Sequence, residues 1–149
     1  MRVAVTARNG TREFECDEGE KILLAGLRRG VELPYECATG TCGTCKARLV
    51  SGYAESAWPE APGRRYLKSE AEVLMCQSVA RTDCALEVGG TLKTGETPPA
   101  PRALRGVLRD QRPLTHDVVA FDGELDGPLD FDAGQFALLA VPGISGARA

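Results

Sequence analysis

Histidine and aromatic residues are scarce in this 149-residue chain, which has one His, one Trp and only 5% aromatic residues. The single histidine, His116, excludes any metal centre that needs two histidine ligands, and we expect it to face solvent. No apolar stretch approaches the length of a membrane span. Residues 1–6 also lack the apolar core of a secretory signal peptide. We therefore expect a cytoplasmic protein without a membrane span.

The chain also has no excess of positive charge. Lys and Arg number 18 against 21 Asp and Glu, a net charge of −3. This balance excludes the basic footprint of a nucleic-acid-binding protein. No Ser-His-Asp constellation, phosphate-binding glycine loop or paired carboxylate site emerges, so we assign no catalytic residue.

Cysteine, in contrast, is well represented, with six residues. Cys37, Cys42 and Cys45 follow the spacing C-x4-C-x2-C, and Cys76 comes later in the run Leu-Met-Cys-Gln. This spacing is typical of the plant-type [2Fe–2S] cluster, which is held by four thiolates. We therefore predict that Cys37, Cys42, Cys45 and Cys76 are the iron ligands of such a cluster.

The residues between the first three cysteines suit a loop that wraps closely round a cluster. They are all small: Ala38, Thr39, Gly40, Thr41, Gly43 and Thr44. Glycine permits the positive φ that such a loop often needs. The same loop can direct backbone N–H groups at the sulfides of the cluster, and such hydrogen bonds are among the factors that set the redox potential.

Three alternatives remain for these cysteines. A structural zinc site usually uses two short C-x2-C pairs, whereas only Cys42 and Cys45 form one here, and Cys76 has no close partner. A disulfide framework needs an oxidising compartment. The third alternative is a set of unrelated buried thiols. For the two remaining cysteines, Cys16 and Cys84, we prefer a role as small core or surface residues.

The pattern of the first 90 residues predicts a small α+β unit. Asn9-Gly10 between two alternating runs is a strong hairpin signal. A helix is expected from Asp17 to Gly30, and a helical turn at 69–72 before a short strand or buried turn that ends at Cys76. The expected strands are 3–7, 11–16, 46–52 and 84–88.

The composition of the chain changes at residues 93–101, which are rich in proline and lack periodicity. We interpret this segment as a linker. After it, residues 102–108, 118–121 and 135–141 are expected to form short strands, as at the start of a β-barrel.

The cysteine motif and element order of residues 1–90 resemble the plant-type ferredoxin family, which has a β-grasp fold. The runs Pro34–Cys37, Trp58–Gly63 and Met75–Gln77 are similar to the ferredoxin domain of NADH-dependent reductase components that serve toluene- and xylene-type monooxygenases. In those proteins the ferredoxin domain precedes an FAD-binding barrel and an NAD-binding domain. The resemblance carries over Cys37, Cys42, Cys45 and Cys76 as iron ligands.

Residues 102–149 resemble the beginning of that FAD-binding barrel. Ala133–Phe136, Val141–Gly143 and Arg148 match the approach to the family's flavin motif Arg-x-Tyr-Ser, of which Arg148 is present and Tyr and Ser are not. The resemblance implies a [2Fe–2S] ferredoxin domain at 1–92, a linker at 93–101 and an incomplete barrel at 102–149. FAD and NADH are implied for a full-length parent, with Arg148 as a flavin contact.

The resemblance predicts the one-electron carrier part of an NADH-dependent reductase. Its electron donor would be the flavin domain, and its acceptor an oxygenase or a Rieske-type carrier. The alternatives are a free-standing ferredoxin-like carrier without reductase activity and a zinc-stabilised binding module. Whether the chain is itself an enzyme stays open, because it lacks complete FAD and NAD sites; it is either a fragment of a longer reductase or a truncated natural product.

Two aromatic residues have alternative interpretations. Trp58 is either a docking contact for the oxygenase or, as we prefer, a ring packed over the fold. Tyr35, with its neighbour Glu36, either shapes the edge of the cluster or only packs and faces solvent.

Overall fold

The computed structural model describes residues 1–93 and 99–142. They fall into two compact units: Met1–Ala100 with the segment that begins at Phe136, and Pro101–Gln135. Residues 94–98 of the predicted linker and the predicted flavin contact Arg148 lie outside the described residues. Among the described residues, no helix is long and apolar enough to cross a membrane.

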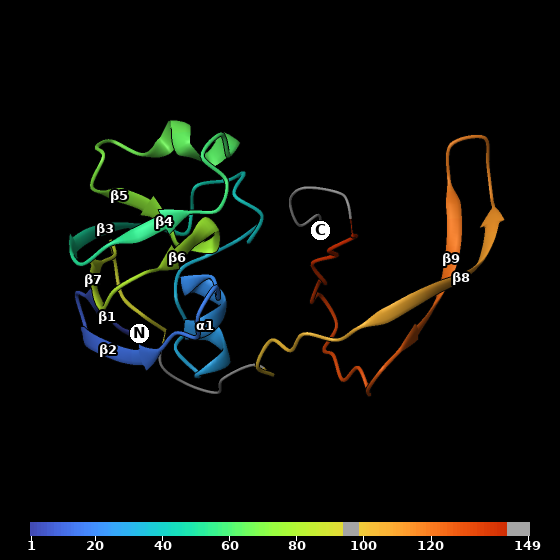
Figure 1. Cartoon of the computed structure of the whole chain (residues 1–149), viewed down its shortest axis with the longest axis horizontal. Helices are drawn as coiled ribbons and strands as arrows, with labels where there is room; N and C mark the ends of the chain where they lie inside the picture. The colour runs from blue at the N-terminus through green and yellow to red at the C-terminus, as the bar shows by residue number, and fades with distance from the viewer. Residues whose placement is uncertain (94–98, 143–149) are drawn as a thin grey trace. The chain divides into compact units, whose positions relative to one another are not determined.

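A five-stranded mixed sheet forms the centre of the first unit (Figure 1). Only the pairing of β1 with β7 is parallel, and the other neighbours are antiparallel. The strands in spatial order are β2 (Gly10–Glu15), β1 (Arg2–Ala7), β7 (Cys84–Glu87), β3 (Lys46–Ser51) and β5 (Glu72–Leu74).

The predicted hairpin is confirmed, and its turn residue has a second contact. Gly10 has a φ of +120°, which only glycine adopts readily. The side chain of Asn9 donates to the Leu92 carbonyl at 2.7 Å and accepts from the Leu92 N–H at 2.9 Å. The hairpin turn therefore also fixes the end of the first unit. Alternation along β1 buries Val3 and Val5 completely.

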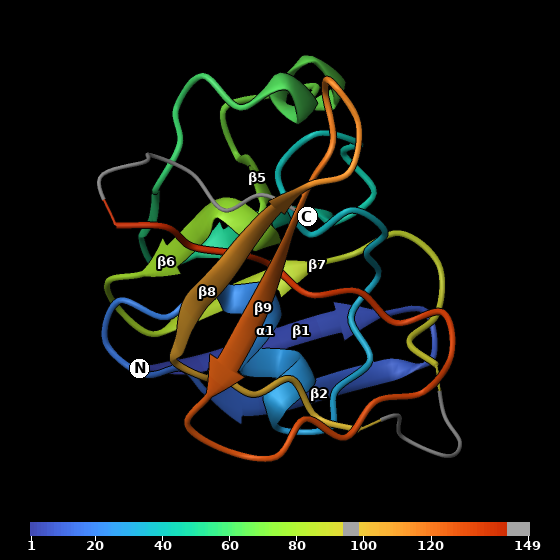
Figure 2. The same ribbon diagram turned by 90° about the vertical axis from the view of Figure 1, so that its right-hand side faces the viewer.

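The helix α1 (Ile22–Arg28) covers one face of this sheet (Figures 1 and 2). Ile22, Leu23 and Ala25 are fully buried, and burial of a side chain as large as leucine contributes roughly 1.5–3 kcal/mol. Our prediction that the helix begins at Asp17 is wrong. Residues 17–20 form a turn in which the Glu20 N–H donates to the Asp17 carbonyl, and Gly19 has a φ of +77°.

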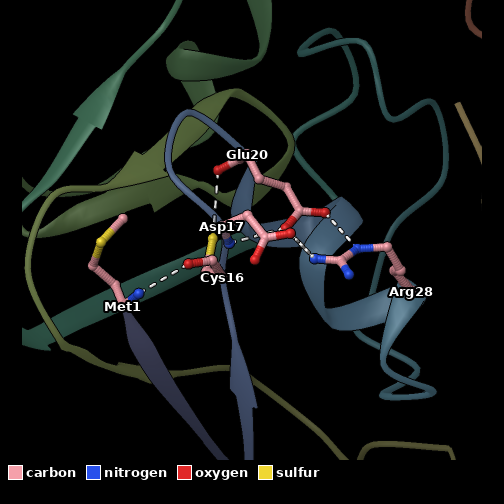
Figure 3. Close-up of polar contacts among 5 residues, drawn as sticks. All are labelled: Met1, Cys16, Asp17, Glu20 and Arg28. Carbon is pink, nitrogen blue, oxygen red and sulfur yellow. Dashed lines mark hydrogen bonds and ion pairs between the residues drawn. The ribbon is translucent and has the colours of Figure 1, made fainter.

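The turn before α1 carries a network of charged side chains (Figure 3). The guanidinium of Arg28 donates to both Glu20 carboxylate oxygens, at 2.8 and 2.6 Å, and to Asp17 at 2.8 Å. The hydrogen bonds from Arg28 lower the pKa of Glu20. Beside this network, Met1 and Cys16 exchange two backbone hydrogen bonds, which fasten β1 to the end of β2.

We expect Glu20→Gln to lower the free energy of unfolding at pH 7 by about 0.5–1 kcal/mol. Because the pKa of Glu20 is lowered in the folded state, its contribution is present above the unfolded pKa of about 4.3. It is lost as the pH falls through the folded pKa. The difference from wild type should therefore stay constant from about pH 8 to 5.5 and shrink below about pH 4.3.

Urea denaturation followed by the fluorescence of the single tryptophan measures this difference. Glu15→Gln, a change at an exposed residue of β2, is the control and should change little. A Glu20→Gln defect that grows as the pH falls would contradict the assignment.

Three short elements of the first unit are not in the sequence prediction: β4 (Ala54–Ser56), β6 (Ser78–Ala80) and the 3₁₀ turn η1 (Pro62–Tyr66). A second 3₁₀ turn, η2 (Met75–Gln77), contains Cys76. The strands β4 and β6 form a separate two-stranded sheet. Elements of three to five residues are too short for hydrophobic periodicity to reveal them. The region expected to be a strand or a buried turn before Cys76 is both, since β5 leads directly into η2.

The second unit is an antiparallel pair of strands, β8 (Gly106–Pro113) and β9 (Val119–Leu125). Their apolar side chains Val107, Leu108 and Phe121 are largely exposed.

The strand predicted at 135–141 is wrong, because this segment has only an isolated bridge residue, Leu139. A strand needs a neighbour along its whole length to accept its hydrogen bonds. The α+β class predicted for the chain is confirmed.

Candidate functional site

The pairing of β3 with β5 brings two distant cysteines together. Lys46 lies opposite Leu74 in the register of this pair, so Cys45, just before β3, approaches η2, just after β5. The Met75 N–H donates to the Cys45 carbonyl at 3.1 Å. The Sγ atoms of Cys45 and Cys76 are 3.1 Å apart and share a hydrogen bond.

The other two cysteines lie on the loop between α1 and β3, where backbone amides point at their sulfurs. The N–H groups of Thr41 and Cys42 each donate to Cys37 Sγ at 3.4 Å. The Thr44 N–H donates to Cys42 Sγ at 3.4 Å. Such donors favour negative charge on sulfur, so the loop is already arranged to hold thiolates.

Burial divides the four cysteines into two pairs. Cys45 and Cys76 are 2% and 1% exposed, whereas Cys37 and Cys42 are partly accessible to solvent. One side of the site is therefore enclosed by the core, and the other side reaches the surface.

The thiol acidities follow the same contacts. Burial raises the pKa of Cys37, but hydrogen bonds from Thr39, Cys42 and Thr41 outweigh it and lower the pKa to about 6. The hydrogen bond shared with Cys76 lowers the pKa of Cys45 and raises that of Cys76. Cys37 and Cys45 thus favour the thiolate, which is the form that binds metal.

The predicted roles of the loop glycines agree with the backbone. Gly40 and Gly43 have φ values of +87° and +77°. A Cβ on Gly40 would lie 2.8 Å from the Gln77 side chain, and one on Gly43 would lie 2.6 Å from the Tyr66 ring. The loop therefore needs glycine at both positions for its conformation and for the space around it.

Cys16 and Cys84 are separate from this site, as predicted. They are 2% and 4% exposed, and burial raises the pKa of each thiol. Their Sγ atoms lie 3.4 Å from the carbonyls of Glu20 and Tyr53 respectively. Both remain protonated core thiols rather than ligands.

The remaining residues singled out in the sequence lie as follows. Trp58 is partly buried against the core, as we preferred. Tyr35 and Glu36 are exposed beside Cys37, and Glu36 accepts a hydrogen bond from the Thr44 hydroxyl at 3.0 Å. The side chain of His116 is 91% exposed, which confirms the prediction.

Two contacts that hold the cysteine loop in place could not be predicted from the sequence. The Gly63 N–H in η1 donates to the Gly40 carbonyl at 2.8 Å. Lys21 Nζ donates to Gln77 Oε1 at 3.0 Å, and Gln77 is buried against Gly40. Both join residues far apart in the chain, so no local pattern could have revealed them.

The donor set fits an iron–sulfur cluster in its chemistry. It offers four thiols, one buried sulfur pair and an amide-lined loop with glycine at two positions of positive φ. In the ranges 1–93 and 99–142, no group of three or more His, Cys, Asp or Glu side chains gathers as a site for one metal ion. Four thiols are the number that holds a [2Fe–2S] cluster.

Comparison with known proteins agrees with this chemistry. Residues 5–81 match the family model described as the 2Fe-2S iron-sulfur cluster binding domain. The chain is 36% identical over 143 residues to the ferredoxin–NAD(+) reductase component of the alkene monooxygenase system of Xanthobacter autotrophicus. It is 38% identical over 133 residues to the ferredoxin–NAD(P)(+) reductase CarAd of Metapseudomonas resinovorans. These matches cover 95% and 88% of this chain but only 43% and 40% of the two relatives.

Solved structures give the same result. The chain matches the ferredoxin reductase in carbazole 1,9a-dioxygenase with a TM-score of 0.80 and 31% identity, over 99% of this chain and 45% of that one. It matches the Amycolatopsis cytochrome P450 reductase GcoB with a TM-score of 0.72 and 31% identity, over 98% and 43%. The predicted ferredoxin-like fold is confirmed, and the chain spans less than half the length of these relatives. The chain belongs to the family of 2Fe-2S iron-sulfur cluster binding domains.

Proposed function

We propose that this chain carries single electrons through a [2Fe–2S] cluster held by Cys37, Cys42, Cys45 and Cys76. The observation that carries the proposal is the buried Cys45–Cys76 sulfur pair beside an amide-lined loop that bears the two more accessible cysteines. When bound, such a cluster takes up one electron and passes it on.

The four cysteines would have two roles: one pair would hold the cluster in the core, and the other pair would hold it at the surface. Cys45 and Cys76, almost fully buried, would hold one iron and exclude water from it. Cys37 and Cys42 would hold the other iron at the surface, where a redox partner can approach. The N–H groups of Thr41, Cys42 and Thr44 stabilise negative charge on the sulfurs, which favours acceptance of an electron.

We propose further that the domain serves a reductase of a multicomponent oxygenase. Its relatives include the xylene/toluene monooxygenase electron transfer component XylA of Pseudomonas putida, 31% identical over 134 residues. A flavin domain reduced by NADH would be the electron donor, and an oxygenase or an intermediate carrier the acceptor. One solved relative is an FAD apo form, which supports FAD in a longer parent of this chain.

On this proposal residues 1–92 are the ferredoxin domain, 93–101 the linker and 102–149 the start of the FAD-binding barrel. The exposed apolar side chains of β8 and β9 support the last assignment, since strands of a barrel bury such residues against one another.

The first test is the visible absorption spectrum of the chain, purified without oxygen, before and after dithionite. We expect a red-brown protein without flavin bands that bleaches on reduction and recovers on reoxidation. Iron and acid-labile sulfide should be present at about two atoms each per chain. A chain that stays colourless after reconstitution with iron and sulfide, or that contains zinc instead, would refute the proposal.

A further inference from the structure

Lys21 immediately precedes the helix α1 and contacts the segment that follows Cys76, the most buried of the four proposed ligands. Its backbone forms an isolated antiparallel bridge with Val79, and its ammonium donates to Gln77 Oε1 at 3.0 Å. Gln77 follows Cys76 directly and is 4% exposed. The lysine is thus fastened at both its backbone and its charged end to the chain on the C-terminal side of Cys76.

The charge of Lys21 has no carboxylate partner among the ion pairs of the described residues. Of the acidic residues just before it, Asp17 and Glu20 are paired with Arg28 (Figure 3), and Glu18 forms no ion pair with Lys21 in the part of the chain that the structure describes. Lys21 is only partly accessible to solvent, and burial lowers its pKa while the charge of Cys76 raises it. Its ammonium is instead held by Gln77, the residue that directly follows Cys76.

We propose that Lys21 sets the redox potential of the site, because its ammonium, held by Gln77, stabilises the negative charge that an added electron brings. The inference rests on the proposed function. One electron enters and no bond is made or broken, so the reduced site carries one more negative charge than the oxidised site. A fixed cation favours the reduced form, and it acts more strongly in a partly buried position than in water.

Gln77 has a positioning role in this arrangement. Its side chain lies against Gly40 in the cysteine loop, where a Cβ would be 2.8 Å from Gln77 Cγ. With its Oε1 accepting from Lys21, the amide connects the ammonium to the loop. Without it, the lysine side chain would be free to turn toward solvent, where its charge is screened.

The test is the midpoint potential, measured by spectroelectrochemical titration of the cluster-loaded chain. Lys21→Met removes the charge, Lys21→Gln removes it but keeps an N–H donor for Gln77, and Lys21→Arg keeps it. Lys93→Met is the control, because it removes one exposed positive charge.

We expect the ratio of reduced to oxidised cluster at a fixed applied potential to fall about tenfold in Lys21→Met and Lys21→Gln, a shift of about 59 mV. Lys21→Arg and Lys93→Met should stay within about twofold of wild type, or about 18 mV. Iron content and the visible spectrum establish that each variant holds its cluster.

Three outcomes overturn the inference: an unchanged potential in both neutral variants, an equal shift in Lys93→Met, or loss of the cluster from Lys21→Gln. A wild-type chain that binds no cluster refutes the proposed function instead, so the two failures are distinct.

Discussion

Serine in place of Cys76 is expected to abolish the visible absorption of the chain and to weaken cluster binding by more than about 100-fold. Loss of an outer-sphere partner alone typically costs about 10–100-fold in metal affinity, and Cys76 is proposed as a direct ligand. Cys76 is 1% exposed, and its Sγ lies 3.1 Å from Cys45 Sγ. Neither water nor the shorter serine side chain can replace it there.

Iron and acid-labile sulfide per chain, measured together with visible absorption, give the result. Cys84→Ser is the matched control, because Cys84 is also a buried thiol of the first unit. It should keep the full cluster and lose at most about 1–3 kcal/mol of stability, as expected when a buried sulfur becomes a hydroxyl. A Cys76→Ser chain with normal iron and sulfide, or a Cys84→Ser chain without them, would contradict the assignment of ligands.

The features that could be predicted from sequence are those in which neighbouring residues carry the signal. The hairpin follows from Asn9-Gly10 between alternating runs, and the positive φ of Gly40 and Gly43 follows from their place in a tight loop. The pattern of three cysteines also suggested a single site. The chain could thus be assigned an α+β fold and a candidate site before the spatial positions of any residues were known.

What the sequence did not reveal depends on contacts between distant segments. The cysteine spacing predicts that Cys76 joins Cys45, but not which strands bring them together. Their approach results from the register of β3 and β5, which neither strand determines alone. The start of α1 was misplaced because Asp17 and Glu20 resemble a helix start, whereas Arg28 uses both to stabilise a turn. The segment 135–141 alternates like a strand, but alternation does not provide a partner strand.

Gly63 is the clearest example of such a contact, and it leads to the second large prediction. Gly63 lies in η1, and its N–H donates to the Gly40 carbonyl of the cysteine loop at 2.8 Å. A Cβ at this position would be 2.7 Å from the Gly40 carbonyl oxygen and 3.2 Å from the Gly43 nitrogen. Both are backbone atoms, which cannot turn aside as a flexible side chain would. Either η1 or the loop must therefore move to accommodate even one methyl group.

We expect Gly63→Ala to cost about 1–3 kcal/mol in the free energy of unfolding, the usual range for overpacking. The displaced loop should also release its cluster at a lower urea concentration than wild type. Anaerobic urea titration, followed by visible absorption and by tryptophan fluorescence, measures both effects.

Gly89→Ala is the matched control, since a Cβ there meets nothing within 4 Å and its φ is not positive. It should stay within about 0.5 kcal/mol of wild type. If Gly63→Ala behaved like Gly89→Ala, that result would contradict the close contact between η1 and the cysteine loop. Loss of the cluster at low urea with tryptophan fluorescence unchanged would instead locate the damage in the loop, because the core around Trp58 would still be folded.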